Sequence, residues 1–117
     1  MVVPRYCPRR GDLIWLDFTP QAGHEQSGRR PALVISHDEY NRKVGLLLAC
    51  PATTQQKGYP FEVSIPDGLP VSGVILADQV RSLDWRFRNA RFIAKAPTDV
   101  LAEALSKLDA LTAEAAQ

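Results

Sequence analysis

The sequence predicts a mainly β domain, a small barrel or sandwich, with a single helix at its C-terminal end. Short apolar segments alternate with Gly- and Pro-rich turns over the first ninety-odd residues, whereas the apolar residues after position 97 recur with the period of a helix. The 117 residues suffice for about one domain. Their 45% hydrophobic and 23% charged content is typical of a globular protein and excludes a wholly disordered chain.

Seven segments of the first part have the composition of β-strands. Residues 13–18 and 31–36 are rich in apolar and β-branched side chains, and Pro31 bounds the second of them. Residues 44–50 form a continuous apolar run, as expected for a strand buried on both faces, and residues 61–65 alternate apolar and polar. The other predicted strands are 73–77, 79–83 and 91–94.

Several single residues within this part have an expected place. We expect Trp15, inside an apolar strand, and Phe92 to be core residues. His37 lies in a polar segment that we expect to be a loop between two strands. Asp78 and Gln79 follow an apolar strand, where they either line a cleft or bond to their own turn.

A helix is predicted over about 98–115, packed on a β body of about 8–96, so that residues 1–117 form one domain. Thr98 is the expected N-cap, and Asp99 favours the positive end of the helix dipole. The expected apolar stripe consists of Leu101, Ala104, Leu105, Leu108 and Leu111. The side chains expected to face away from it are Glu103, Lys107, Asp109 and Glu114.

Charge and cysteine content narrow the function classes. The net charge is +1, but residues 1–97 carry +4, and ten of the fourteen basic residues are Arg, whose guanidinium suits phosphate and carboxylate ligands. The chain has no apolar run of the roughly 20 residues that a membrane helix needs. Its first residues are basic but no apolar stretch follows them, so we do not expect a signal peptide. Its two Cys residues form no CxxC motif, so we expect neither a zinc site nor a disulfide framework. Without an export signal, we expect a reduced, cytoplasmic protein. We expect no cofactor.

The long connection 19–30 is the first candidate for chemistry, since loops of this length are often functional. It contains His24, Glu25, Arg29 and Arg30, and these groups suit acid–base catalysis on a phosphodiester. The alternative is a solvated loop with incidental ion pairs.

Two further segments have the chemistry of a nucleic-acid site. Thr53 and Thr54 follow a buried strand, where hydroxyls can donate to phosphate and Lys57 can join them, or else the threonines satisfy their own turn. In the segment 81–92, arginines alternate with Trp85, Phe87 and Phe92, a pattern that suits single-stranded nucleic acid but also ordinary strand alternation. The arginines are Arg81, Arg86, Arg88 and Arg91.

These segments together resemble the MazF/PemK toxins of toxin–antitoxin pairs, and the MazF branch more than PemK. The matching blocks run in order over nearly the whole chain: GDLIWLDF (11–18), HEQSGRRPALVIS (24–36), CPATTQQKGYPFEV (50–63) and GVILADQVRSLDWR (73–86). The resemblance implies a small SH3-like β-barrel with a C-terminal helix that acts as a homodimer. It also implies neutralisation by a MazE-like antitoxin with an acidic tail.

The resemblance further implies metal-independent cleavage of single-stranded RNA, chiefly messenger RNA, at a short motif for which an ACA-like core is the working hypothesis. The ribose 2′-hydroxyl would attack the adjacent phosphate and leave 2′,3′-cyclic phosphate and 5′-hydroxyl ends. The catalytic residues of the family fall on Glu25, Arg30 and Thr53. The residues expected to contact RNA are His24, Arg29, Thr54, Gln55, Lys57, Gln79, Arg81 and Arg86.

These positions fit the chemistry. Glu25 is the candidate base, and Arg30 with the Thr53 hydroxyl would stabilise the charge that develops on phosphorus. The identity of the general acid stays open. Arg30 is a poor proton donor, so a water molecule and His24 are candidates beside it. The rival hypotheses are a gyrase-directed toxin of the same fold and a non-catalytic SH3-like binding module. A metal-dependent nuclease fits poorly, since no carboxylate cluster has ligand spacing.

Overall fold

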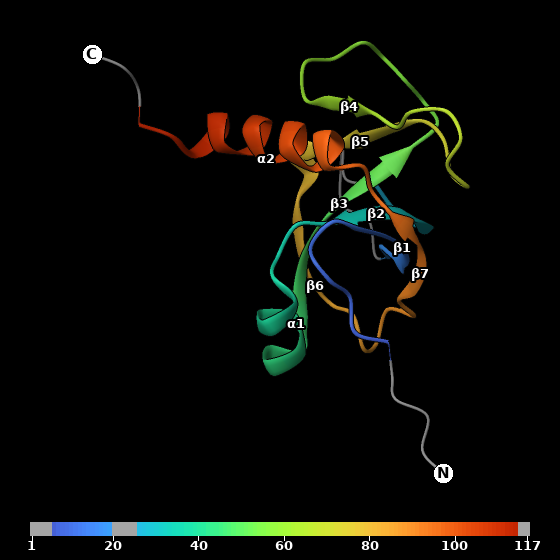
Figure 1. The fold of residues 1–117 in the computed structure, drawn as a ribbon, viewed down its shortest axis with the longest axis vertical. Coiled ribbons are helices and arrows are strands. Elements are labelled where there is room, and N and C mark those ends of the chain that lie inside the picture. Colours follow the sequence, from blue (N-terminus) through green and yellow to red (C-terminus); the bar gives the residue numbers. More distant parts are fainter. Residues whose placement is uncertain (1–5, 20–25, 115–117) are drawn as a thin grey trace.

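The computed structural model describes residues 6–19 and 26–114 of the chain. They fold into an antiparallel sheet, with a short helix at one end of the molecule and a longer one at the other (Figure 1). In chain order the elements are β1 (Asp12–Asp17), β2 (Arg29–Val34), α1 (Asp38–Val44), β3 (Leu46–Thr53), β4 (Glu62–Ser64), β5 (Val74–Leu76), the 3₁₀ helix η1 (Ala77–Gln79), β6 (Arg81–Asp84), β7 (Arg91–Lys95) and α2 (Thr98–Thr112).

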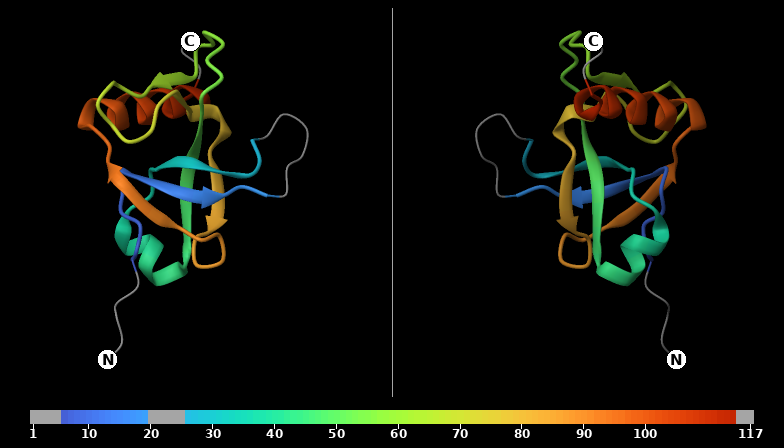
Figure 2. Two further views of the ribbon diagram at one scale, coloured as in Figure 1. Left: turned by 90° about the vertical axis from the view of Figure 1, so that its right-hand side faces the viewer. Right: turned by 90° about the vertical axis from the view of Figure 1, so that its left-hand side faces the viewer.

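Strand β3 organises the sheet. The strand order is β4-β5-β3-β2-β1-β7, and β6 also pairs with β3. Ala49 of β3 pairs with β2 on one edge and with β6 on the other, while the end of β3 pairs with β5. The sheet curls round itself (Figure 2), but the described parts of β4 and β7 do not pair with each other. The result is an open, barrel-like sheet, and the predicted mainly β fold with a C-terminal helix is confirmed.

Both faces of the sheet are buried, so the strands need apolar side chains on both sides. One core cluster lies between the sheet and α2 and includes Leu13, Leu33, Cys50, Val63, Ile75, Val100 and Ala104. The other lies on the opposite face of the sheet and includes Ile14, Leu16, Phe18, Val34, Leu47, Leu83 and Trp85. No helix in the described part of the chain is long and apolar enough to cross a membrane.

The expectation that His37 lies in a loop between strands is wrong, because the residues after it form α1. His37 is the N-cap, and Gly45 ends the helix in the left-handed conformation at φ 82°. Buried Asn41 stabilises the helix from inside, since its amide donates to Pro8 O at 2.9 Å and its Oδ1 accepts from Ser36 Oγ at 2.6 Å. Strands β2 and β3 accordingly differ from the predicted segments 31–36 and 44–50.

Helix α2 is close to its prediction but differs in detail. Pro97 is the N-cap and Thr98 is already helical, so the predicted N-cap is wrong, and the helix ends at Thr112 rather than near 115. Val100 and Ala104 are the buried positions, whereas Leu111 at the predicted stripe is 49% exposed. Lys107 does not face away from the sheet: its Nζ donates to Glu62 O of β4 at 2.7 Å.

Trp15 and Phe92 are not core residues, contrary to expectation. Trp15 is 36% exposed and Phe92 is 52% exposed. Trp15 lies on the same face of β1 as Leu13, because side chains alternate along a strand. Leu13 packs in the cluster under α2, and Trp15 lies beyond that cover. The open face that results adjoins the cavities described below.

Candidate active site

Two neighbouring cavities meet at the end of β3. The first, which we call the Arg30 cavity, has a volume of about 490 Å³; its lining includes Trp15, Gln26, Arg29, Arg30, Thr53, Thr54 and Gln55. The second, the Lys57 cavity, has a volume of about 350 Å³; its lining includes Gln26, Thr53, Gln55, Lys57, Tyr59, Glu62 and Gln79. Gln26, Thr53 and Gln55 line both. Most of the predicted site residues that the structure describes therefore lie round one surface.

The pairing of β2 with β3 brings Arg30 and Thr53 together. Ala32 pairs with Pro51, and extending this antiparallel register by two residues places Arg30 opposite Thr53. The Arg30 guanidinium is held by two carbonyl groups: Nε donates to Ser27 O at 2.7 Å and Nη1 to Ala52 O at 3.3 Å. Its Nη2 donates no hydrogen bond within residues 6–19 and 26–114, so one face of a fixed cation remains available to an anion.

Thr53 is positioned by the start of β5. It pairs with Val74, and Gly73 just before that strand passes so close that a Cβ atom there would lie 2.2 Å from Thr53 O. Only glycine permits this approach. The Thr53 hydroxyl oxygen accepts the backbone N–H of Gln55 at 3.2 Å, which leaves its own proton to donate. Sequence reasoning missed the role of Gly73, whose only visible sign is its place before an apolar strand.

The wall of the Lys57 cavity depends on a residue that sequence reasoning also missed. Glu62 is buried, at 9% exposure, and its carboxylate accepts the backbone N–H groups of Lys57, Gly58 and Tyr59. Across the cavity, Gln79 Oε1 accepts the N–H of Gln26 at 3.0 Å. Gln79 therefore lines a cleft, which was one of the two alternatives for it.

Three of the arginines expected to contact RNA have protein partners. Arg29 Nη1 pairs with Asp17 Oδ1 at 3.1 Å, and its Nη2 donates to Asn89 O at 2.8 Å. Arg81 donates to Phe18 O at 3.0 Å. Arg86, which lines a third cavity of about 670 Å³ together with Arg29, donates to the last turn of α1 at 2.9 Å. Arg29 borders both this cavity and the Arg30 cavity, whereas Arg81 lines neither.

Hydrogen bonding and burial shift the pKa values of Asp17, which lines the third cavity, and of the two cysteines. The hydrogen bond from Asn89, together with Arg29, lowers the pKa of Asp17 below its ordinary value. Burial, with a contribution from Asp78, raises the pKa of Cys50 to about 12, and burial also raises that of Cys7. Both thiols are therefore protonated at neutral pH, and neither is a nucleophile.

Residues 9–112 match the family described as the PemK-like, MazF-like toxin of type II toxin–antitoxin systems. The chain belongs to this family. It is 56% identical, over 89 residues, to a protein named endoribonuclease toxin MazF from Escherichia coli K12; these residues are 76% of this chain and 79% of that protein. It is 38% identical over 108 residues to the endoribonuclease toxin ChpB of the same organism, a match that covers 87% of this chain and 91% of ChpB.

Solved structures of the MazF-like family have the same fold. The crystal structure of MazF from Deinococcus radiodurans matches with a TM-score of 0.90 at 61% identity, covering 92% of this chain and 98% of that one. A MazE–MazF crystal structure from the same organism matches with a TM-score of 0.84, covering 92% of this chain and 97% of that one. The family and the fold class that the sequence resemblance implied are confirmed.

Two of the predicted site residues of this MazF-like toxin, His24 and Glu25, lie outside the described residues. The described part of the chain contains no group of three or more His, Cys, Asp or Glu side chains that could hold a metal ion. The arrangement thus presents a fixed guanidinium, a hydroxyl with a free proton and amide side chains round two joined cavities. These groups bind and stabilise anionic oxygen, as a phosphodiester has.

Proposed function

We propose that this chain is a toxin endoribonuclease that cuts single-stranded RNA, chiefly messenger RNA, at a short sequence motif and so stops translation. Membership of the MazF-like family supports this proposal, as does the endoribonuclease named in its E. coli relative. The observation that carries it is the meeting of Arg30 and Thr53, from neighbouring strands, at one cavity. A gyrase-directed toxin or a non-catalytic SH3-like module would not need a cation and a hydroxyl in that arrangement.

The proposed reaction is an in-line displacement at phosphorus that needs no metal. The ribose 2′-oxygen forms a bond to phosphorus and gives its proton to Glu25, while the bond from phosphorus to the 5′-oxygen breaks. Arg30 and the Thr53 hydroxyl stabilise the extra negative charge on the phosphorane. The leaving 5′-oxygen takes a proton from Arg30, from water or from His24, and the ends are a 2′,3′-cyclic phosphate and a 5′-hydroxyl.

The RNA would extend from this phosphate into the adjoining cavities. The base next to the cut would enter the Lys57 cavity, where Gln55 and Gln79 offer amide groups and Lys57 a charge. Thr54 and Arg29 would contact the backbone from the Arg30 cavity, and Arg86 from the third cavity. Arg81 is placed to hold the chain near Phe18 and contributes to binding only indirectly.

We further propose that residues 1–117 act as one domain, in a cytoplasmic homodimer, and that a cognate MazE-like antitoxin neutralises it. The MazE–MazF complexes of D. radiodurans support such a partner. An acidic antitoxin tail would be attracted by residues 1–97, whose net charge is +4, and would pair with their arginines.

A cleavage assay tests the proposed function. A long unstructured RNA, incubated with the protein in excess EDTA, should be cut at a recurring motif, and fragment ends should be 5′-hydroxyl and 2′,3′-cyclic phosphate. Replacing the ribose 5′ of the cut with deoxyribose should abolish cleavage and leave binding intact. Arg30→Ala should lower the rate about 100- to 1,000-fold, the usual cost of one charge-stabilising donor.

The matched control is Arg42→Ala, which removes an arginine of α1 that lines neither the Arg30 nor the Lys57 cavity. It should cut at the wild-type rate. Circular dichroism and the mass in solution should show that both variants fold and associate alike. Cleavage that survives the deoxyribose substitution would point to water as the nucleophile, and a wild-type protein that cuts no RNA would leave the non-catalytic alternatives.

A further inference from the structure

We propose that Glu62 is a positioning residue that fixes one wall of the Lys57 cavity and thereby determines which base is accepted beside the cut. The wall is the backbone of residues 57–59. This inference rests on the proposed endoribonuclease function and adds to it a residue that makes no contact with the reacting atoms.

A single carboxylate holds this wall. Glu62 Oε2 accepts the backbone N–H of Lys57 at 2.9 Å, and Oε1 accepts those of Gly58 at 2.9 Å and Tyr59 at 3.3 Å. The backbone N–H of Glu62 also donates to Tyr59 O at 3.0 Å. Hydrogen bonds to a charged acceptor are the stronger ones, and three of them converge here on one side chain.

The wall has little other support. Residues 54–60 are exposed and belong to no strand or helix. Gly58 has φ +77°, a left-handed conformation, and a Cβ atom there would have no neighbour within 4 Å. The Tyr59 ring is partly exposed and packs edge to face on Phe61, with the ring centroids 5.8 Å apart. Since burial does not fix the segment, its conformation depends on the Glu62 carboxylate.

Helix α2 holds Glu62 in turn. Lys107 Nζ donates to Glu62 O at 2.7 Å and pairs with Glu103 at 3.0 Å on the same helix. This explains why Lys107 lies against the sheet rather than in solvent. A continuous set of contacts therefore runs from α2 through β4 to the cavity wall.

The wall matters because of where the Lys57 cavity lies. The cavity shares Thr53 with the Arg30 cavity, so whatever occupies it lies beside the phosphate that Thr53 and Arg30 would hold. Its volume of about 350 Å³ lies within the range of ligand sites. A site discriminates between bases by hydrogen-bonding groups held in fixed positions, and a wall that moves loses this discrimination before it loses catalysis.

The test compares Glu62→Gln with the wild type on a short RNA of the preferred motif and on a long unstructured RNA. The amide of glutamine keeps the shape but offers one acceptor oxygen and turns an N–H₂ group toward backbone donors. We expect KM to rise about tenfold, the effect of roughly one lost hydrogen bond, with kcat within about twofold of wild type. Mapped fragment ends should show a relaxed preference at one base beside the cut.

Two more variants keep the test decisive. Gly58→Ala strains only the exposed wall, so it should fold and relax the same base even if Glu62→Gln does not fold. The matched control is Glu39→Gln, which removes an exposed carboxylate of α1 that pairs with Lys43 and lines neither the Arg30 nor the Lys57 cavity, and it should keep the wild-type motif. If Glu62→Gln and Gly58→Ala both cut the wild-type motif with unchanged KM, or lose kcat with the motif unchanged, the inference is overturned. A wild-type protein that cuts no RNA overturns the proposed function itself.

Discussion

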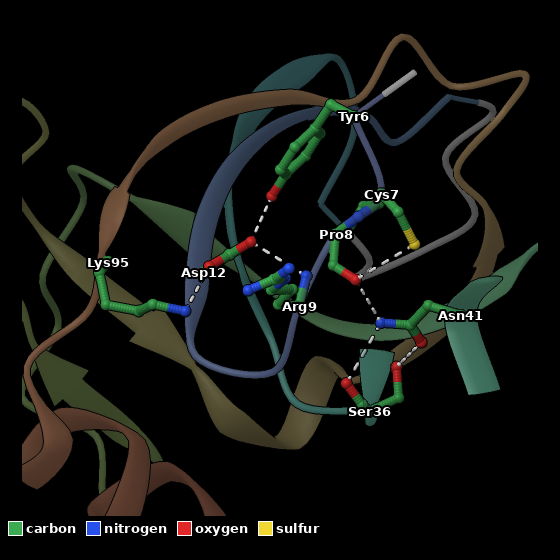
Figure 3. Close-up of polar contacts among 8 residues, drawn as sticks. All are labelled: Tyr6, Cys7, Pro8, Arg9, Asp12, Ser36, Asn41 and Lys95. Carbon is green, nitrogen blue, oxygen red and sulfur yellow. Dashed lines mark hydrogen bonds and ion pairs between the residues drawn. The ribbon is translucent and has the colours of Figure 1, made fainter. Parts of the chain in front are cut away.

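The polar residues near the N-terminus and those at the end of β3 differ in where their hydrogen bonds go. Near the N-terminus, Asp12 is 1% exposed and accepts from Tyr6 Oη, from the backbone N–H of Arg9 at 2.9 Å and from Lys95 Nζ at 2.9 Å (Figure 3). Buried Asn41 bonds to Ser36 and Pro8 in the same region. At the end of β3, Thr53, Gln55 and Lys57 instead line open cavities.

This difference predicts which residues determine the stability of the fold and which determine its function. Buried polar groups that bond to one another are costly to disturb, because removing one leaves its partners unsatisfied. The exposed polar side chains of the cavities, such as Gln55 and Lys57, contribute little to folding and can contact a ligand. The buried hydrogen bonds of Asp12 and Asn41, which we call the N-terminal network, should therefore determine the free energy of unfolding. The side chains round the two cavities should determine the cleavage activity.

The largest expected effect comes from Asn41→Ala. It removes the acceptor for Ser36 Oγ and the donor to Pro8 O and leaves a small void in a fully buried position. The free energy of unfolding should fall by about 2–4 kcal/mol. The cleavage rate per folded molecule should stay at the wild-type value, because Asn41 lines neither the Arg30 nor the Lys57 cavity. Denaturant titration, together with the RNA assay, measures both.

Glu39→Gln is the control for this prediction. Glu39 lies on the same helix but is exposed and pairs with Lys43 across one turn. Its substitution should change stability by less than about 0.5 kcal/mol. An Asn41→Ala protein that is as stable as wild type, or that folds but loses cleavage, would contradict the division between the two regions.

Thr53→Val should give the opposite result. Valine has the shape of threonine and suits a strand end, so stability should change by less than about 1 kcal/mol. Loss of the hydroxyl should lower the cleavage rate about 10- to 100-fold, with binding of the uncut deoxyribose RNA nearly unchanged. Thr54→Val, which alters the next residue in the same cavity, should cost much less. Equal losses from the two variants would remove Thr53 from its catalytic role.

The sequence predicted well what depends on local periodicity and on the family resemblance. The helical spacing after Thr98 identified α2, and the motif blocks placed Arg30 and Thr53 at one site. Helix α1 was missed because it is short and polar, and the partner that stabilises it, Pro8 O, lies 33 residues from Asn41. Glu62 and Gly73 were missed for a related reason: their roles arise only when β4 and β5 pair beside the end of β3.

Substitution of Asp17 should have the smallest effect on stability. Asp17 shares features of both regions, since it bonds to Asn89 and Arg29 within the protein but is partly exposed. Its folded-state pKa is lowered, chiefly by the hydrogen bond from Asn89 and then by Arg29. Such a carboxylate stabilises the fold above its unfolded pKa of about 3.9, and this stabilisation is lost as the pH falls through the lower folded value.

Asp17→Asn should therefore lower the free energy of unfolding at pH 7 by less than about 1 kcal/mol, because the pair with Arg29 is 37% and 29% exposed and solvent screens it. The difference from wild type should shrink as the pH falls below about 4, and 1 M salt should reduce it at pH 7. Denaturant titrations at several pH values measure it. A difference that persists unchanged in acid would mean that Asp17 acts through neutral hydrogen bonds, as the residues of the N-terminal network do, rather than through its charge.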